Sequence, residues 1–128
     1  MKLLIVEDNA LMRRLIKSIV SDLADQIEEC EDGAEVLEAY EKHFPELILM
    51  DVKMPKTDGI TASREVLARY PQAKICIVTD YSDAKTRRAA TDAGALDYVL
   101  KDNLTDIRKV IIKNHQEYEN EYNLPRQL

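Results

Sequence analysis

The chain has 128 residues, of which 24 are acidic and 18 are basic, so its formal net charge is −6. Leu, Ile, Val and Phe supply 34 residues, about 27%, whereas disordered acidic chains fall below about 20%. The net negative charge disfavours direct contact with nucleic acid, because it would repel the phosphates. The longest apolar runs have four residues, which is too short to span a membrane.

The start of the chain and the cysteines both indicate an intracellular protein. The first apolar run meets Glu7 and Asp8 after four residues, and a secretory signal could not accommodate these charges there. Cys30 and Cys76 show no CxxC spacing and are too few for a disulfide scaffold. We therefore expect a cytoplasmic protein with two reduced thiols and no membrane segment.

Short apolar runs alternate with amphipathic segments along the chain. The runs are nearly continuous rather than alternating, which is typical of strands buried on both faces of a parallel sheet. The predicted strands are the runs at residues 3–6, 47–50, 75–78 and 98–100, together with residues 26–30, which lie between the first run and the second. The segments between and after them have helical periodicity. The predicted helices are residues 10–23, 34–44, 60–70, 82–93 and 104–118.

Helix-capping signals support this division. Ser82 and Asn103 are candidate N-caps of the last two helices, and Gly94 is a C-cap signal. Five strands that each precede a helix predict an α/β fold with a doubly wound parallel sheet. In such sheets the functional groups lie at the carboxyl ends of the strands.

Polar side chains stand at four of the five strand ends. Glu7 and Asp8 follow the first strand, Asp51 the third and Lys101 the fifth, while Thr79 follows the fourth run. A single residue of this kind is most often just a solvated strand end. Together, however, they would converge on one edge of the sheet, where three carboxylates repel each other and favour a divalent cation. Mg²⁺ prefers such oxygen ligands.

These segments also resemble the receiver domain of bacterial response regulators, over about residues 2–117. The matching segments are residues 6–9, 49–55 with 58–59, 78–79 and 98–101. The resemblance implies a five-stranded flavodoxin-like (βα)5 fold with strand order 2-1-3-4-5.

The resemblance also implies a role for each residue at the strand ends. Asp51 would accept a phosphoryl group from the phosphohistidine of a sensor histidine kinase or a histidine phosphotransfer protein. Asp8, Asp51 and the backbone carbonyl of Lys53 would bind Mg²⁺ directly, and Glu7 would bind it through water. Lys101 would pair with Asp51 and then with the phosphoryl oxygens, because this transfer depends on positioning and charge neutralisation.

The remaining residues concern switching. By the same resemblance, Thr79 would bind a phosphoryl oxygen, and Tyr98 would move between exposed and buried rotamers. The signal would pass through the fourth helix, fifth strand and fifth helix. Asp102 replaces the proline usual after Lys101, which resembles the subgroup that precedes a helix-turn-helix output domain, and we expect a trans bond there. Asp80 replaces a small residue, and it either modulates the site from its rim or turns outward.

We therefore expect a phosphorylation-activated receiver of a two-component system. It would not be an enzyme beyond its own phosphoryl uptake and autodephosphorylation. A phosphohydrolase of the haloacid dehalogenase type would need an Asp two positions after Asp51, where Lys53 stands. A receiver that binds partners without phosphorylation is disfavoured by the complete set of site residues.

The expected domain covers residues 1–118, and residues 119–128 form a C-terminal tail. Nothing after residue 118 could form an output domain, so we expect either a stand-alone receiver or one excised from a DNA-binding regulator. The residues Lys101 and Asp102 favour descent from a DNA-binding regulator. The downstream partner would be a protein target or an output domain. His43 and His115 are expected to be isolated and to face solvent.

Overall fold

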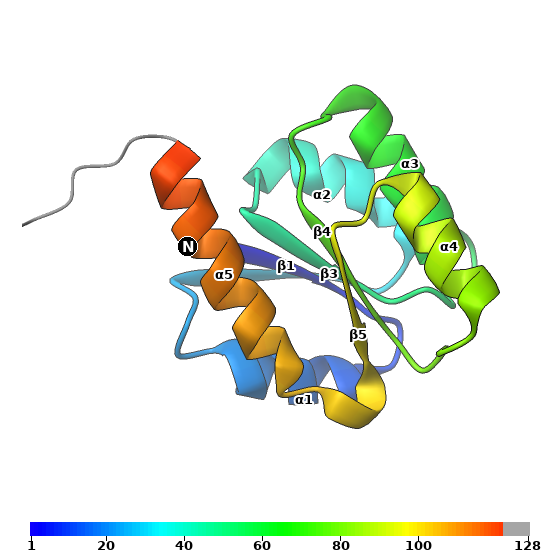
Figure 1. Ribbon diagram of the computed structural model, residues 1–128, viewed down its shortest axis with the longest axis horizontal. Coiled ribbons are helices and arrows are strands. Elements are labelled where there is room, and N and C mark those ends of the chain that lie inside the picture. Colours follow the sequence, from blue (N-terminus) through cyan, green and yellow to red (C-terminus); the bar gives the residue numbers. More distant parts are fainter. Residues whose placement is uncertain (122–128) are drawn as a thin grey trace, which may run out of the picture.

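The computed structural model describes residues 1–121 and contains one sheet with helices on both faces (Figure 1). The strands are β1 (Lys2–Val6), β2 (Gln26–Cys30), β3 (Leu47–Met50), β4 (Ile75–Thr79) and β5 (Asp97–Leu100). The α-helices are α1 (Ala10–Val20), α2 (Val36–His43), α3 (Gly59–Arg69), α4 (Ala84–Ala93) and α5 (Asp106–Glu121). Two short 3₁₀ helices are η1 (Gly33–Glu35) and η2 (Lys101–Asn103).

All strand pairs are parallel, and the order is β2-β1-β3-β4-β5. This confirms the predicted doubly wound, flavodoxin-like fold. The predicted strands 26–30 and 47–50 agree with β2 and β3, and each of the other three strands is one residue longer than predicted. Every residue of β3 and β4 is buried, because helices cover both faces of the sheet.

Helices α1 and α5 cover one face of the sheet, and α2, α3 and α4 cover the other (Figure 1). Alternate residues of β1 therefore enter different cores. Leu3 and Ile5 pack with Ile16 of α1 and Ile111 of α5, whereas Leu4 lies in the core beneath the other three helices. The two cores hold the central strands in place, so the residues that follow those strands share one edge.

The helix starts depend on capping aspartates and an asparagine. Asn9, Asp58 and Asp83 each accept a hydrogen bond from a backbone N–H in the first turn of α1, α3 and α4, respectively. The predicted cap at Ser82 is wrong by one position, because the carboxylate of Asp83 accepts from the Thr86 N–H at 2.9 Å. Gly94 adopts a left-handed conformation (φ 102°) and ends α4, as predicted.

The C-terminal helix differs most from its prediction. Asn103 does not cap it, because residues 101–103 form η2, and α5 begins at Asp106 instead. Residues 119–121 continue α5, and the rest of the predicted tail lies outside the described residues. None of the peptide bonds within residues 1–121 is cis, so the bond before Asp102 is trans as expected. Within the same residues, no helix has the length and apolar character that crossing a bilayer requires.

Candidate phosphorylation and cation site

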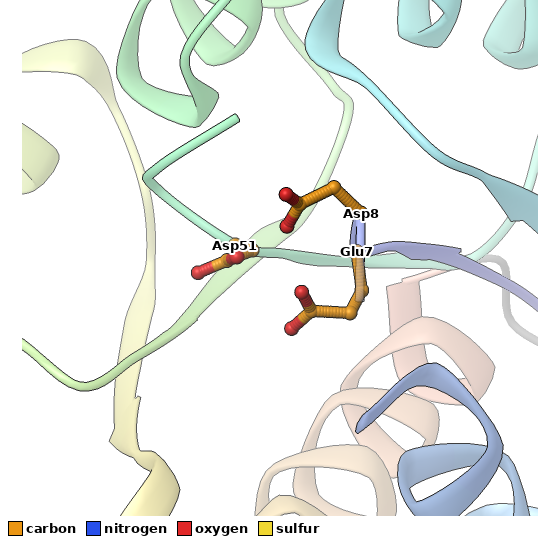
Figure 2. Close-up of side chains that lie close together, drawn as sticks. All are labelled: Glu7, Asp8 and Asp51. Atoms are coloured by element: carbon orange, nitrogen blue, oxygen red, sulfur yellow. The ribbon is translucent and has the colours of Figure 1, made fainter. Parts of the chain in front are cut away.

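Three carboxylates meet at the carboxyl edge of the central strands. Val6 of β1 is aligned with Met50 of β3, and the Asp51 N–H donates to the Val6 carbonyl at 2.9 Å. The side chains of Glu7, Asp8 and Asp51 therefore point toward a shared space (Figure 2), and one oxygen of each lies within 4.8 Å of the others. Glu7 and Asp51 are buried, whereas Asp8 is exposed.

Lys101, which follows β5, partly neutralises these acids. It stands at the first position of η2, directly after β5, and its side chain is only 10% exposed. Its Nζ lies 2.8 Å from Glu7 Oε1 and 3.3 Å from Asp51 Oδ1. One buried ammonium group thus faces two buried carboxylates, and Asp8 adds a third negative charge beside them.

The burial of this cluster changes its proton affinities. The pKa of Glu7 is raised to about 7, mainly by burial and to a smaller degree by the nearby charge of Asp51, which together outweigh the opposing effects of Lys101 and the Asn9 N–H. Burial alone would lower the pKa of Lys101, but its contacts with Glu7 and Asp51 outweigh that effect and raise it. The lysine is therefore held in its charged form.

The donor set fits a hard divalent cation. Asp51 Oδ1 already accepts from the Val52 N–H at 2.8 Å, whereas Oδ2 has no hydrogen-bond partner within residues 1–121. Asp8 and Asp51 supply oxygen donors for such an ion. The three acids also carry more negative charge than the one lysine neutralises, which favours a bound cation. Lys53, whose backbone carbonyl is the predicted third ligand, lies on the wall of the same cleft.

A cleft of about 760 Å³ connects these groups with the residues predicted to respond to them. Its lining includes Glu7, Asp8, Asp51, Lys53, Thr79, Asp80 and Lys101. Asp80 is exposed on this lining, which is the rim position considered for it. All the residues predicted at the strand ends therefore surround one cleft.

Thr79 and Tyr98 are linked through the backbone of a residue that the sequence reasoning did not single out. The buried hydroxyl of Thr79 accepts from the Tyr81 N–H at 3.3 Å. The Tyr98 hydroxyl donates to the Tyr81 carbonyl at 2.5 Å, and the Arg87 guanidinium lies 4.5 Å from the centre of the Tyr98 ring. Nothing in the local sequence around Tyr81 marks a backbone relay of this kind.

Two more residues near the site were also missed. Arg13 of α1 donates to the Glu7 carbonyl at 2.7 Å and to Glu29 Oε1 at 3.1 Å, so it fastens the end of β1. Asp32 accepts hydrogen bonds from the loop between β3 and α3. The Asp-Gly pair at residues 32–33 is a recognisable turn signal, but it does not tell which distant loop the turn would contact.

Both histidines lie at the opposite edge of the sheet, and the prediction that they are isolated is wrong. His115 Nδ1 lies 2.8 Å from Glu46 Oε2, and its Nε2 lies 2.9 Å from Glu119 Oε1. His43 is partly buried, with Nε2 3.6 Å from Glu28. The helical pattern could not reveal these contacts because their partners, apart from Glu119, come from other elements.

Comparisons with known proteins agree with this geometry. Residues 3–112 match the family described as the response regulator receiver domain. The chain is 39% identical over 101 residues to the chemotaxis protein CheY of Bacillus subtilis, which covers 78% of this chain and 84% of that protein. It is 32% identical over 103 residues to the transcriptional regulatory protein DegU of Brevibacillus brevis, covering 79% of this chain but only 44% of that relative.

A solved structure has the same fold. The crystal structure of a DNA-binding response regulator of the LuxR family from Staphylococcus aureus superposes with a TM-score of 0.80. The sequences are 22% identical, and the match covers 88% of this chain and 97% of that one. At this level of identity the likeness extends to the fold.

Proposed function

Since the chain belongs to the response regulator receiver domain family, we propose that it is a phosphorylation-activated switch in the cytoplasm. Asp51 would accept the phosphoryl group from the phosphohistidine of a sensor histidine kinase or a histidine phosphotransfer protein. The observation that carries this proposal is the position of Asp51 between a lysine and two further carboxylates in an open cleft.

Each group of the cleft has a part in the proposed transfer. An oxygen of Asp51 attacks phosphorus, the P–O bond forms, the P–N bond to imidazole breaks, and the electron pair leaves with the nitrogen. The Lys101 ammonium lies 3.3 Å from Asp51 Oδ1, so it is close enough to pair with the phosphoryl oxygens once the group is on Asp51. Thr79 offers a hydroxyl from the end of β4.

The proposed cation is Mg²⁺, held by Asp8, Asp51 and the carbonyl of Lys53, with Glu7 acting through water. When bound, it supplies positive charge that neutralises the phosphoryl oxygens. Glu7 then keeps Lys101 beside the site through the 2.8 Å contact between Nζ and Oε1. On this proposal the chain catalyses only its own phosphoryl uptake and loss, and the position of Lys53 argues against a dehalogenase-like phosphohydrolase.

The output would pass through α4, β5 and α5. If the Thr79 hydroxyl turns toward a phosphoryl group, the Tyr81 N–H loses its acceptor and the loop before α4 is free to shift. The Tyr81 carbonyl holds the Tyr98 hydroxyl, so this shift would also change the position of the Tyr98 ring. A downstream protein or an output domain would bind the changed surface.

Incubation with acetyl phosphate, followed by intact mass measurement, tests the proposal. Wild type should gain one phosphoryl group in Mg²⁺ and none in EDTA, and Asp51→Asn should gain none. Asp92→Asn is the matched control, because Asp92 is exposed on α4 away from the cleft, and it should be labelled normally. Labelling of Asp51→Asn, or equal labelling of wild type in EDTA, would overturn the proposal.

A further inference from the structure

Asp32 lies in the turn between β2 and η1 and is only 6% exposed. Its carboxylate accepts three backbone hydrogen bonds. Oδ1 accepts from the Ala34 N–H at 2.9 Å and from the Thr57 N–H at 3.0 Å, and Oδ2 accepts from the Lys56 N–H at 2.9 Å. A carboxylate with three such donors is an unusually firm anchor, because each bond to a charged acceptor is stronger than a neutral one.

Two of these bonds cross to a different part of the chain. Lys56 and Thr57 belong to the loop of residues 51–58 between β3 and α3, 24 and 25 positions after Asp32. The Gly33 N–H also donates to the Thr57 carbonyl at 3.2 Å. The turn and the loop therefore hold each other through three hydrogen bonds, and Asp32 contributes two of them.

The close approach depends on the absence of a side chain at Gly33. A Cβ atom added there would lie 2.3 Å from the Thr57 carbonyl oxygen and 3.1 Å from that of Asp58. Both obstacles are backbone atoms, so the loop itself would have to move. The Asp-Gly pair is thus shaped to dock the loop, and its glycine cannot be exchanged without displacing it.

The loop carries the backbone that faces the cleft. The loop begins at Asp51. Its two ends are joined by a hydrogen bond of 2.8 Å from the Gly59 N–H to the Val52 carbonyl. Residues 53–55 lie between this bond and the anchors at Lys56 and Thr57, and they line the cleft. Fixing Lys56 and Thr57 therefore limits how far the Lys53 carbonyl can move relative to Asp51.

The electrostatics support a charged anchor. Hydrogen bonds from the Ala34 and Lys56 N–H groups, and from Thr57, hold the pKa of Asp32 below its usual value. Asp32 is therefore an anion at neutral pH. It is not one of the clustered carboxylates, Glu7, Asp8 and Asp51, so it does not compete for the cation.

We propose that Asp32 is a positioning residue for the cation site. It acts through the loop of residues 51–58, and it prearranges the Lys53 carbonyl for a divalent cation. This inference rests on the proposed function, because it needs the cation to bind at Asp8 and Asp51. Outer groups that orient metal ligands commonly contribute 10- to 100-fold to affinity.

The test compares Mg²⁺ binding by NMR titration without any phosphodonor in wild type, Asp32→Ala and Asp32→Asn. We expect binding about tenfold weaker in Asp32→Ala and about threefold weaker in Asp32→Asn, which keeps one acceptor oxygen. Hydrogen exchange of the amides of residues 53, 54, 56 and 57 in the metal-free protein should speed up, while that of the β3 and β4 amides should not. A purely structural contribution to stability would speed exchange throughout.

Asp83→Ala is the matched control. It also removes a carboxylate that accepts a backbone N–H, but at α4 rather than at the loop, and it should leave Mg²⁺ affinity unchanged. A folded Asp32→Ala protein with Mg²⁺ affinity within twofold of wild type would overturn the inference. If Asp32→Ala does not fold, Asp32→Asn decides in the same way. Failure of wild type to bind Mg²⁺ would instead overturn the proposed function.

Discussion

The two edges of the sheet use charge in opposite ways. At the carboxyl edge, buried Glu7 and Asp51 both contact the Lys101 ammonium, and exposed Asp8 lies beside them. At the amino edge, Glu46 and Glu119 both contact His115, and the N-terminal amine pairs with Asp25. The first edge concentrates like charges at a cost in stability, whereas the second distributes its acids among basic partners.

Aromatic packing sharpens this contrast. Tyr40, Phe44 and Tyr70 form a cluster near the amino edge, with ring centres 5.1 to 5.8 Å apart. At the carboxyl edge, the backbone of Tyr81 instead links Thr79 to the Tyr98 hydroxyl through hydrogen bonds, and the Tyr98 ring contacts Arg87 of α4. The amino edge is thus built for stability, and the carboxyl edge gives up stability for a site that can bind and respond.

The largest effect on folding should come from the amino edge. Tyr40→Ala removes a ring that is only 4% exposed and opens a cavity among its neighbours, so it should lower the free energy of unfolding by about 3 kcal/mol. Urea denaturation measures this loss. Mg²⁺ affinity should not change under native conditions, and a tenfold change would contradict the separation of the two edges.

A smaller loss is expected at the carboxyl edge when Lys101 is removed. Lys101→Ala leaves Glu7 and Asp51 without the ammonium group that contacts both, which should cost about 2 kcal/mol in metal-free protein. The matched control at the amino edge is Lys74→Ala, whose partner Glu121 is 3.8 Å away and mostly exposed. That control should lose less than about 1 kcal/mol in the same urea experiment.

Removing an acid from the carboxyl edge should have the opposite sign. Asp51→Asn or Asp8→Asn relieves like-charge repulsion, so the metal-free protein should be as stable as wild type or up to about 1 kcal/mol more stable. Mg²⁺ binding should weaken at the same time. Glu46→Gln at the amino edge should give no such gain, because that carboxylate faces a histidine. A clear loss of stability in either Asp variant would refute the repulsion argument.

The relay between the cleft and α4 can be broken without removing the phosphoacceptor. Thr79→Ala should still be labelled by acetyl phosphate, but the NMR shifts of residues 96–101 on addition of beryllofluoride should be smaller than in wild type. In wild type the Tyr81 N–H loses its acceptor when the Thr79 hydroxyl turns toward the phosphoryl group. In Thr79→Ala that hydroxyl is absent, so phosphorylation cannot change this hydrogen bond. Identical shifts in the two proteins would remove Thr79 from the relay.

The smallest effect is expected at the rim. Asp80 adds a negative charge to the cleft lining, and at about 7 Å and an effective dielectric of about 20 a unit charge would repel an anionic donor by roughly 2 kcal/mol before screening. Because Asp80 is exposed, screening should reduce this to about a twofold change in rate. Asp80→Ala should be labelled faster by acetyl phosphate at low salt, and the difference should shrink as salt is added. Equal rates at low salt would mean that Asp80 has no influence on the site.

Much of the site could be predicted because strand ends are easy to locate. Buried parallel strands require continuous apolar runs, so the run at 47–50 marked β3 at its observed bounds. The first polar residue after a run then lies at the sheet edge, as Asp51 does. Helix starts were less certain, since both Ser82 and Asp83 are good caps and only the hydrogen bond to Thr86 distinguishes them.

The sequence by itself thus determined the alternation of strands and helices, the edge on which the charged residues meet, and the chemistry of those residues. Tertiary structure alone decided which distant groups face each other. The contact of Asp32 with the loop of residues 51–58, the link from Thr79 to Tyr98 through Tyr81, and the pairing of His115 all join different elements of the fold. Local periodicity reports which side of an element is buried, but the partner on that side is set by how the elements pack.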